Sequence, residues 1–168
     1  MTNSHSHFLH VSVATESDRP VLEQLWTMFR HDMSAYSGVL PDTQGRFRQE
    51  RLDNALHEAT WRGYVLRLGA TPAGLCIVRS VGSPEQVINS FFLVNAARRF
   101  GYGRAAVRTV TNQHQGRWAV AFHEANLAAA AFWRTVTAEE DPKWSSEREH
   151  VPGRPDLPGD LWIRFRVR

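Results

Sequence analysis

The sequence has very little cysteine. Its single cysteine, Cys76, excludes an intrachain disulfide and the zinc sites that are built on several cysteines. A chain without disulfides suits a reducing compartment, so we expect a cytoplasmic protein. Cys76 lies in the apolar run 74–78, and this setting is typical of a small core residue rather than a nucleophile.

Long hydrophobic runs are also missing. No apolar stretch approaches the roughly 20 residues that cross a bilayer, and residues 1–7 lack the hydrophobic segment of a secretory signal. We therefore expect no membrane partner. We expect residues 1–7, with His5 and His7, to be a disordered lead-in rather than a metal site, and we expect no metal ion elsewhere. Residues 8–168 have the length of a single domain with its own core.

Lysine is almost absent. Of the 20 basic residues only Lys143 is a lysine, a skew that suggests a GC-rich coding genome and hence a bacterial source. The arginines are spread along the chain, and the net charge is only +3. Because a nucleic-acid-binding protein usually concentrates its basic residues in one patch, the sequence disfavours a nucleic-acid partner.

Hydrophobic periodicity predicts an α/β fold in the order β-α-α-β-β-β-α-β-α-β-β, with helices on the faces of a sheet. Tyr36–Gly45 is expected to be a loop. The predicted strands lie at 8–15, 64–68, 73–79, 87–94, 118–122, near 144–151 and at 161–168. The predicted helices lie at about 20–33, at 48–57, after Gly103 and at 127–136.

The strongest functional signal lies between residues 87 and 113, where an apolar strand ends at Val94 and Gly101 and Gly103 open a helix. Glycines let the backbone approach a ligand closely, and the first N–H groups of a helix favour an anion. The pattern predicts a pyrophosphate site. A Rossmann-type dinucleotide site is disfavoured by the antiparallel hairpins upstream. Three arginines could add charge-assisted bonds to phosphate, namely Arg98, Arg99 and Arg104.

Two segments resemble the motifs of one family. Arg98-x-x-Gly101-x-Gly103 resembles the acetyl-coenzyme A signature Q/R-x-x-G-x-G/A of GNAT acetyltransferases. Residues 126–133, with the pattern N-x-x-A-x-x-F-W, resemble the later N-x-x-A-x-x-F-Y segment of the same family. The order of elements over 11–168 also matches, so the resemblance covers nearly the whole chain.

The resemblance implies a GNAT fold with a mixed central sheet of six to seven strands and acetyl-coenzyme A as cosubstrate. Strands 87–94 and 118–122 would splay apart to admit it. Backbone groups of residues 92–94 would pair with the pantetheine arm, N–H groups of 99–104 would hold the pyrophosphate, Asn126 would reach the pantetheine or the cofactor's far end, and Phe132 would pack beside it. The implied cofactor-binding residues are Phe92, Leu93, Val94, Arg98, Arg99, Phe100, Gly101, Tyr102, Gly103, Arg104, Asn126 and Phe132.

The chain departs from the family pattern at the positions of the usual acid and base. Asn-Ser at 89–90 stands where many relatives carry a glutamate base, and Trp133 stands where many carry a tyrosine acid. Candidate replacements are His123, Glu124 and Glu85. His123 ranks first because its ordinary pKa of about 6.5 suits proton transfer. We expect direct attack by the amine in a ternary complex, helped mainly by positioning.

Three functions stay open. The first is an N-acetyltransferase for a primary amine of a small molecule or a peptide, with an acceptor site shaped by loops 36–46 and 151–159 and a possible homodimer. The second is a non-catalytic acyl-coenzyme A sensor or interaction module, favoured by the missing acid and base. The third is nucleic-acid binding. Three carboxylates near the first loop could hold a cationic acceptor, although a solvated face is the simpler interpretation: Asp32, Asp42 and Glu50.

Overall fold

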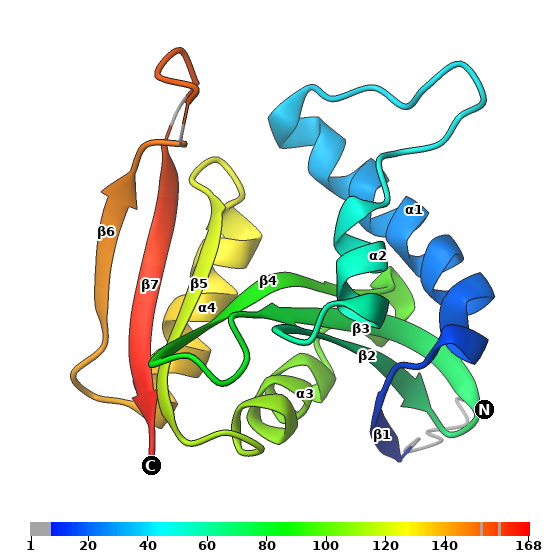
Figure 1. The fold of residues 1–168 in the computed structure, drawn as a ribbon. Helices are drawn as coiled ribbons and strands as arrows, with labels where there is room; N and C mark the ends of the chain where they lie inside the picture. The colour runs from blue at the N-terminus through cyan, green and yellow to red at the C-terminus, as the bar shows by residue number, and fades with distance from the viewer. Residues whose placement is uncertain (1–7, 152, 158) are drawn as a thin grey trace, which may run out of the picture.

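A computed structural model describes residues 8–151, 153–157 and 159–168. The expected lead-in at 1–7 lies outside them. The structure is a seven-stranded sheet with helices packed on both faces (Figure 1), and the predicted α/β order of elements is confirmed. No helix in the described ranges is long and apolar enough to cross a membrane.

The strands are β1 (Leu9–Val13), β2 (Trp61–Leu68), β3 (Thr71–Arg79), β4 (Glu85–Leu93), β5 (Gly116–His123), β6 (Ser145–Glu149) and β7 (Asp160–Val167). The helices are α1 (Arg19–Ser37), α2 (Glu50–His57), α3 (Tyr102–Thr111) and α4 (Leu127–Glu140), with short 3-10 turns at η1 (Glu16–Asp18) and η2 (Asn95–Ala97). The strand order is β1-β2-β3-β4-β5-β7-β6. All neighbouring strands run antiparallel except β4 and β5, which are parallel and are connected through η2 and α3.

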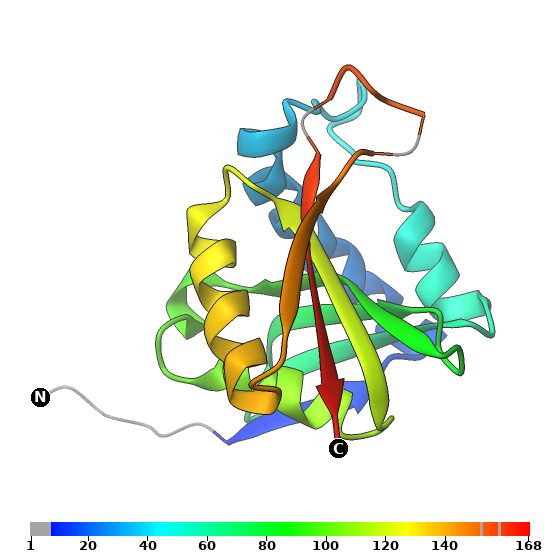
Figure 2. The ribbon, with the colours of Figure 1, turned by 90° about the vertical axis from the view of Figure 1, so that its left-hand side faces the viewer.

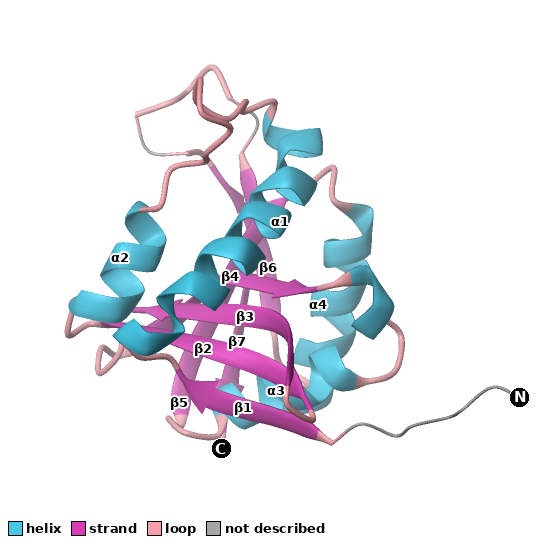
Figure 3. Ribbon diagram, turned by 90° about the vertical axis from the view of Figure 1, so that its right-hand side faces the viewer, coloured by secondary structure: helices cyan, strands magenta, loops and turns pink. Residues whose placement is uncertain are grey.

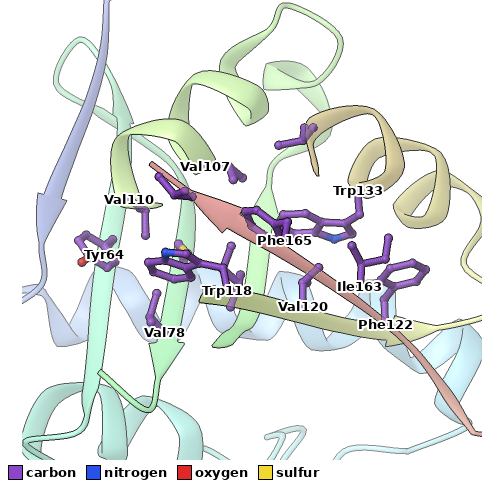
Figure 4. Packing of buried hydrophobic residues seen from close by; sticks show 14 of the residues in the cluster. Tyr64, Val78, Val107, Val110, Trp118, Val120, Phe122, Trp133, Ile163 and Phe165 are labelled. Atoms are coloured by element: carbon purple, nitrogen blue, oxygen red, sulfur yellow. The ribbon is translucent and has the colours of Figure 1, made fainter. Parts of the chain in front are cut away.

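Each face of the sheet has its own core. On one face α1 and α2 lie over β2, β3 and β4 (Figure 3), where Leu25, Trp26 and Leu52 are buried. On the other face α3 lies against β1 and α4 against β5 and β7, and Trp118 and Trp133 lie in the largest cluster (Figure 4). The β5–β7–β6 end of the sheet, seen toward the viewer in Figure 2, has α4 against one side. Because α1 and α2 pack on β2–β4, the second face of β5 and β7 is left open beside them.

Helix α1 is longer than predicted. Asp18 accepts a hydrogen bond from the Thr15 N–H (2.9 Å) just before the helix, and Pro20 lies in its first turn. Tyr36, which the sequence pattern places in a loop, lies in the last helical turn. The helix ends only at Gly38, whose left-handed backbone (φ 67°) is favourable for glycine.

The pairing between β4 and β5 is short. Residues 85–88 pair with residues 117–120, and beyond that point the two strands separate (Figure 1). On its other side β4 pairs with β3, with Ile77 opposite Ser90 and Val78 opposite Ile88, so Asn89 has no partner. Such a bulge bends a strand and increases its local twist. The splay expected for these two strands is therefore confirmed, and it begins at the bulge.

We predict that Gly74→Ala destabilises the protein by about 1–3 kcal/mol, the usual effect of overpacking. A Cβ atom at Gly74 would collide with the carbonyl oxygen of Phe92 on β4. Denaturant unfolding followed by circular dichroism measures the loss. In the control Gly63→Ala, on β2, the nearest contact is a methyl carbon of Ala55 at 3.3 Å, so the expected loss is smaller. Equal losses in the two variants would contradict this account of the β3–β4 contact.

Candidate functional site

A cavity of about 360 Å³ lies where β4 and β5 separate. It extends from the gap between the two strands to the corner between α1, α2 and the open face of β7. Its lining comes from segments far apart in the sequence: Phe29, Arg30, Met33, Tyr36 and Ser37 of α1, Arg51 of α2, Arg79 of β3, residues 87–91 of β4, 120–123 of β5, Asp160 and Trp162 of β7, and Asn126, Ala129 and Trp133 at α4.

The backbone of β4 presents only some of its polar groups to the gap. The Val94 N–H donates to the Ala73 carbonyl (2.8 Å), so Val94 faces β3. Because antiparallel pairing alternates, Phe92 also turns its N–H and C=O toward β3, whereas Leu93 and Phe91 turn theirs away from it. The register thus turns the N–H groups of Phe92 and Val94 toward β3, while their expected pairing with the pantetheine arm stays a prediction. Phe91, which the sequence analysis missed, joins Leu93, because the register that decides this is not visible in the sequence.

The loop before α3 forms a row of unpaired donors. Arg99 (φ 68°) and Gly101 (φ 83°) have left-handed backbones, and the first helical hydrogen bond runs from the Ala105 N–H to the Gly101 carbonyl (3.1 Å). The N–H groups of residues 99–104 have no acceptor within the described chain. Successive free N–H groups at a helix N-terminus make a site for an anion. The loop thus has the geometry of the predicted phosphate site.

Gly103 lets this loop pack tightly against α4. A Cβ atom at Gly103 would lie 3.1 Å from the ring of Phe132. That ring stacks on Phe91 of β4, with centroids 5.7 Å apart and planes inclined by 12°. Phe132 therefore connects the loop, α4 and the edge of the gap.

The three arginines near the loop before α3 differ in their ion-pair partners. Arg98 does not extend from the loop as expected, because its Nη2 pairs with Asp32 of α1 (2.7 Å) and its Nε donates to the Leu93 carbonyl (2.8 Å). Arg104 pairs with Glu139 (3.2 Å). Arg99 makes no ion pair with any described residue, so it is the arginine whose charge is available to a bound phosphate.

His123 lines the cavity at the end of β5. Its Nδ1 accepts a hydrogen bond from the Ala125 N–H (3.1 Å), and its ring stacks on Tyr36 with centroids 6.1 Å apart. A backbone N–H can only donate, so Nδ1 holds a lone pair and the neutral ring carries its proton on Nε2. His123 is therefore held as a hydrogen-bond donor rather than as a base.

The two glutamates proposed beside it lie elsewhere. Glu124 is exposed and pairs with Arg148. Glu85 lies at the closed end of the strand pair, where it pairs with Arg117 and Arg164 at 3.3 Å each. Neither lines the cavity. The structure thus brings only His123 of the three candidates to the gap.

Asn126 has a local structural role. Its Oδ1 caps α4 by accepting from the Ala129 N–H (3.0 Å), and the residue is buried at the cavity wall. Its amide NH₂ makes no hydrogen bond within the described residues and could meet a ligand. The positions of the usual base and acid, Ser90 and Trp133, are both buried and both line the cavity.

Sequence reasoning missed three cavity arginines, Arg30, Arg51 and Arg79. They come from α1, α2 and β3, and no motif connects them. Arg51 is solvent-accessible, as a side chain on an open cavity wall must be, yet protein surrounds it closely enough for burial to lower its pKa. The charges of Arg30 and Arg79 lower that pKa further, and Asp160 acts in the opposite direction.

Cys76 lies away from the cavity. It is fully buried, and burial raises the pKa of its thiol far above the ordinary range. Within the described residues, no group of three or more histidines, cysteines or carboxylates is placed to hold a metal ion.

Solved structures of acetyltransferases share this fold. An acetyltransferase from Thermus thermophilus superimposes with a TM-score of 0.68 at 16% identity, covering 96% of this chain and 99% of that one. A GNAT-family acetyltransferase from Staphylococcus aureus gives 0.67 at 7% identity, covering 96% and 100%. Arabidopsis thaliana Naa50, in complex with the bisubstrate analogue CoA-Ac-MVNAL, gives 0.62 at 10% identity, covering 93% and 97%. No protein-family model and no curated protein matches the sequence. At such identities the likeness establishes the fold, which is the GNAT fold that the sequence motifs implied.

We predict that Cys76 of the folded protein does not react with a thiol-specific reagent, because the thiolate needed for reaction is disfavoured by burial. Labelling by Ellman's reagent should become complete only in denaturant. Rapid labelling of the native protein would contradict the burial of this side chain.

Proposed function

We propose that this protein is an acetyl-coenzyme A-dependent N-acetyltransferase, which transfers the acetyl group to a primary amine of a small molecule or peptide by direct attack in a ternary complex. The observation that carries the proposal is the gap between β4 and β5, with the unpaired N–H groups of residues 99–104 beside it. We call these residues the donor loop. A parallel strand pair that opens at a bulge leaves backbone groups without partners, and such groups need a ligand or water.

The residues present fit acetyl-coenzyme A. The N–H groups of 99–104 and the charge of Arg99 would hold its pyrophosphate, because both favour a dianionic group at a helix N-terminus. The outward N–H and C=O groups of Phe91 would pair with an amide of the pantetheine arm. Bound there, the cosubstrate supplies an activated acetyl thioester. Phe132 would form the apolar wall between the loop and the gap.

The cavity offers donors for the groups that become negative during transfer. The Leu93 N–H faces the gap and can stabilise charge that develops on a carbonyl oxygen. His123 can donate a hydrogen bond from its Nε2–H to the departing thiolate and stabilise that charge, and solvent would protonate the thiolate in place of the missing tyrosine. Cys76 is buried away from the cavity, which supports direct transfer without an acyl-enzyme.

The missing glutamate has an electrostatic substitute. Ammonium must lose a proton before it can attack, and neighbouring positive charge favours the neutral amine. Three arginines and one carboxylate, Asp160, line the cavity. A bound amine there would have a lowered pKa, and Asp160 or water can accept its proton.

A non-catalytic acyl-coenzyme A sensor is the second candidate, because Ser90 and Trp133 occupy the positions of the usual base and acid. It predicts cofactor binding without release of coenzyme A thiol in the presence of amines. A screen of primary amines for thiol release therefore separates the two functions.

We predict that Gly101→Glu weakens acetyl-coenzyme A binding by about tenfold or more, because it places a negative charge in the donor loop. Titration calorimetry measures the dissociation constant. Gly69→Glu is the matched control: it adds the same charge at another exposed, left-handed glycine (φ +60°), at the β2–β3 turn. If both variants bind as the wild type does, the loop is not the phosphate site.

We predict that His123→Phe lowers kcat by about 100-fold, the lower range for loss of a hydrogen-bond donor to developing charge, without changing the acetyl-coenzyme A dissociation constant. Phenylalanine keeps a ring beside Tyr36 but removes the Nε2 donor. Tyr36→Phe serves as the control, since it keeps the stacking and should retain most activity. An unchanged kcat in His123→Phe would show that the donor is another group.

A further inference from the structure

The cavity wall is strongly positive on the side of α1 and α2. Arg30, Arg51 and Arg79 line it together, and Asp160 is the only carboxylate among the lining residues. None of the three arginines makes an ion pair within the described chain, although ten other arginines do. Their charges are therefore not paired with a carboxylate in direct contact, although Asp160 and Glu50 act on Arg51 from further away.

Each of the three guanidinium groups is held in place by weak contacts. Arg51 donates from Nη1 to Ser90 Oγ at 3.5 Å, next to the β4 bulge. Arg79 lies over the ring of Trp162, 5.9 Å from its centroid. Arg30 lies over Trp26 at 5.9 Å, and its buried Nε has no hydrogen-bond partner among the described residues. Such contacts fix the positions of the guanidinium groups but leave most of their N–H donors free.

This arrangement is unfavourable without a ligand. Burial lowers the pKa of both Arg30 and Arg51; the charges of Arg30 and Arg79 lower that of Arg51 further, and the charge of Arg48 lowers that of Arg30. The folded chain therefore carries a cost at this wall. Groups held in an unfavourable state often mark a binding site. A bound anion would remove the cost, because guanidinium groups bind carboxylates through paired, charge-assisted hydrogen bonds.

The three carboxylates near the first loop, which could hold a cationic acceptor, are all engaged elsewhere. Asp32 pairs with Arg98 (2.7 Å), and Glu50 pairs with Arg48 (2.8 Å). Asp42 accepts the N–H groups of Gln44 (2.9 Å) and Arg46 (2.8 Å) within its own loop. None of these three lines the cavity. The site therefore lacks the negative surface that a polycationic acceptor needs.

The arginines are also separate from the phosphate loop. They lie on the α1–α2 face, whereas the loop opens α3, which packs on the opposite face. Two anion-binding regions at one gap fit two anionic molecules. The cavity volume of about 360 Å³ is at the small end for ligand sites, so the second molecule should be small.

We propose that the acceptor is a small amine that carries a carboxylate, such as an amino acid, and that Arg51 and Arg79, with Arg30, bind that carboxylate. The inference rests on the proposed acetyl transfer. The positive wall both orients the acceptor and favours its neutral amine, whose proton passes to Asp160 or water, so the same cluster selects the substrate and prepares it for attack.

The first test compares substrates with the wild-type enzyme. Thiol release from acetyl-coenzyme A is measured with free amino acids, with their amides, and with the amines that lack the carboxylate. We expect free amino acids to be preferred by about tenfold to a hundredfold in kcat/KM, as for a hydrogen-bonded charge. Equal or better turnover of the amides would overturn the inference while leaving acetyl transfer intact. A preference for amines that carry phosphate would overturn the assignment to a carboxylate.

The second test uses variants. Arg51→Met and Arg79→Met should raise KM for amino acids by about tenfold or more while leaving the acetyl-coenzyme A dissociation constant unchanged. Arg166→Met, at an exposed position of β7 outside the cavity, removes the same charge and should have no effect. Circular dichroism confirms folding. An unchanged KM in both cavity variants would contradict the proposal.

A third measurement does not need turnover. In the presence of coenzyme A, N-acetyl amino acids should bind the wild type more tightly than the corresponding N-acetyl amides do, as seen by calorimetry. If no amine releases thiol but this preference is present, the acetyl transfer fails and the anion site stands. If the preference is absent, the anion site fails whatever the activity.

Discussion

The hydrogen-bonded ladder between β4 and β5 ends after four residue pairs, and the rest of the site depends on that ending. The extra residue at Asn89 turns β4 away from its parallel neighbour while β4 stays paired with β3. Phe91 and Leu93 are consequently left with backbone groups that face a gap. A regular β4 would have continued the ladder and closed the sheet. Strand geometry, rather than any catalytic side chain, opens the cavity at this point of the sheet.

Packing around the gap keeps it in shape. Gly103 has no side chain, so α3 comes close to Phe132, and Phe132 stacks on Phe91 of β4. From the other side, Arg98 connects the end of β4 to α1 through the Leu93 carbonyl and Asp32. A residue of the phosphate-binding signature thus acts as a brace between the strand and a helix. The donor loop and the gap are held as one unit before any ligand arrives.

The positive charge of the site lies in two separate regions. At the start of α3 the positive charge is partial and comes from backbone N–H groups, with Arg99 beside them. At the α1–α2 wall it is formal, from three arginines that approach one another without paired carboxylates. Repulsion between like charges that are held close together opposes folding. A bound anion would be attracted by the same charges, so they would favour its binding. The absence of a glutamate at the bulge is consistent with this second arrangement, since a negative side chain there would neutralise it.

The sequence by itself determined the fold class, the order of elements and the position of the donor loop. These depend on local patterns: hydrophobic period, turn residues, and glycines at a helix start. It placed Gly101 and Gly103 correctly because one needs a left-handed backbone and the other a close contact. Only the tertiary structure decided which backbone groups of 91–94 face the gap, since strand register is a long-range property. The tertiary structure also brings Arg30, Arg51 and Arg79 together at one cavity. It places Glu85 and Glu124 in ion pairs outside that cavity. Side chains that come together from separate elements have no characteristic spacing in the sequence, so no motif predicts their contact.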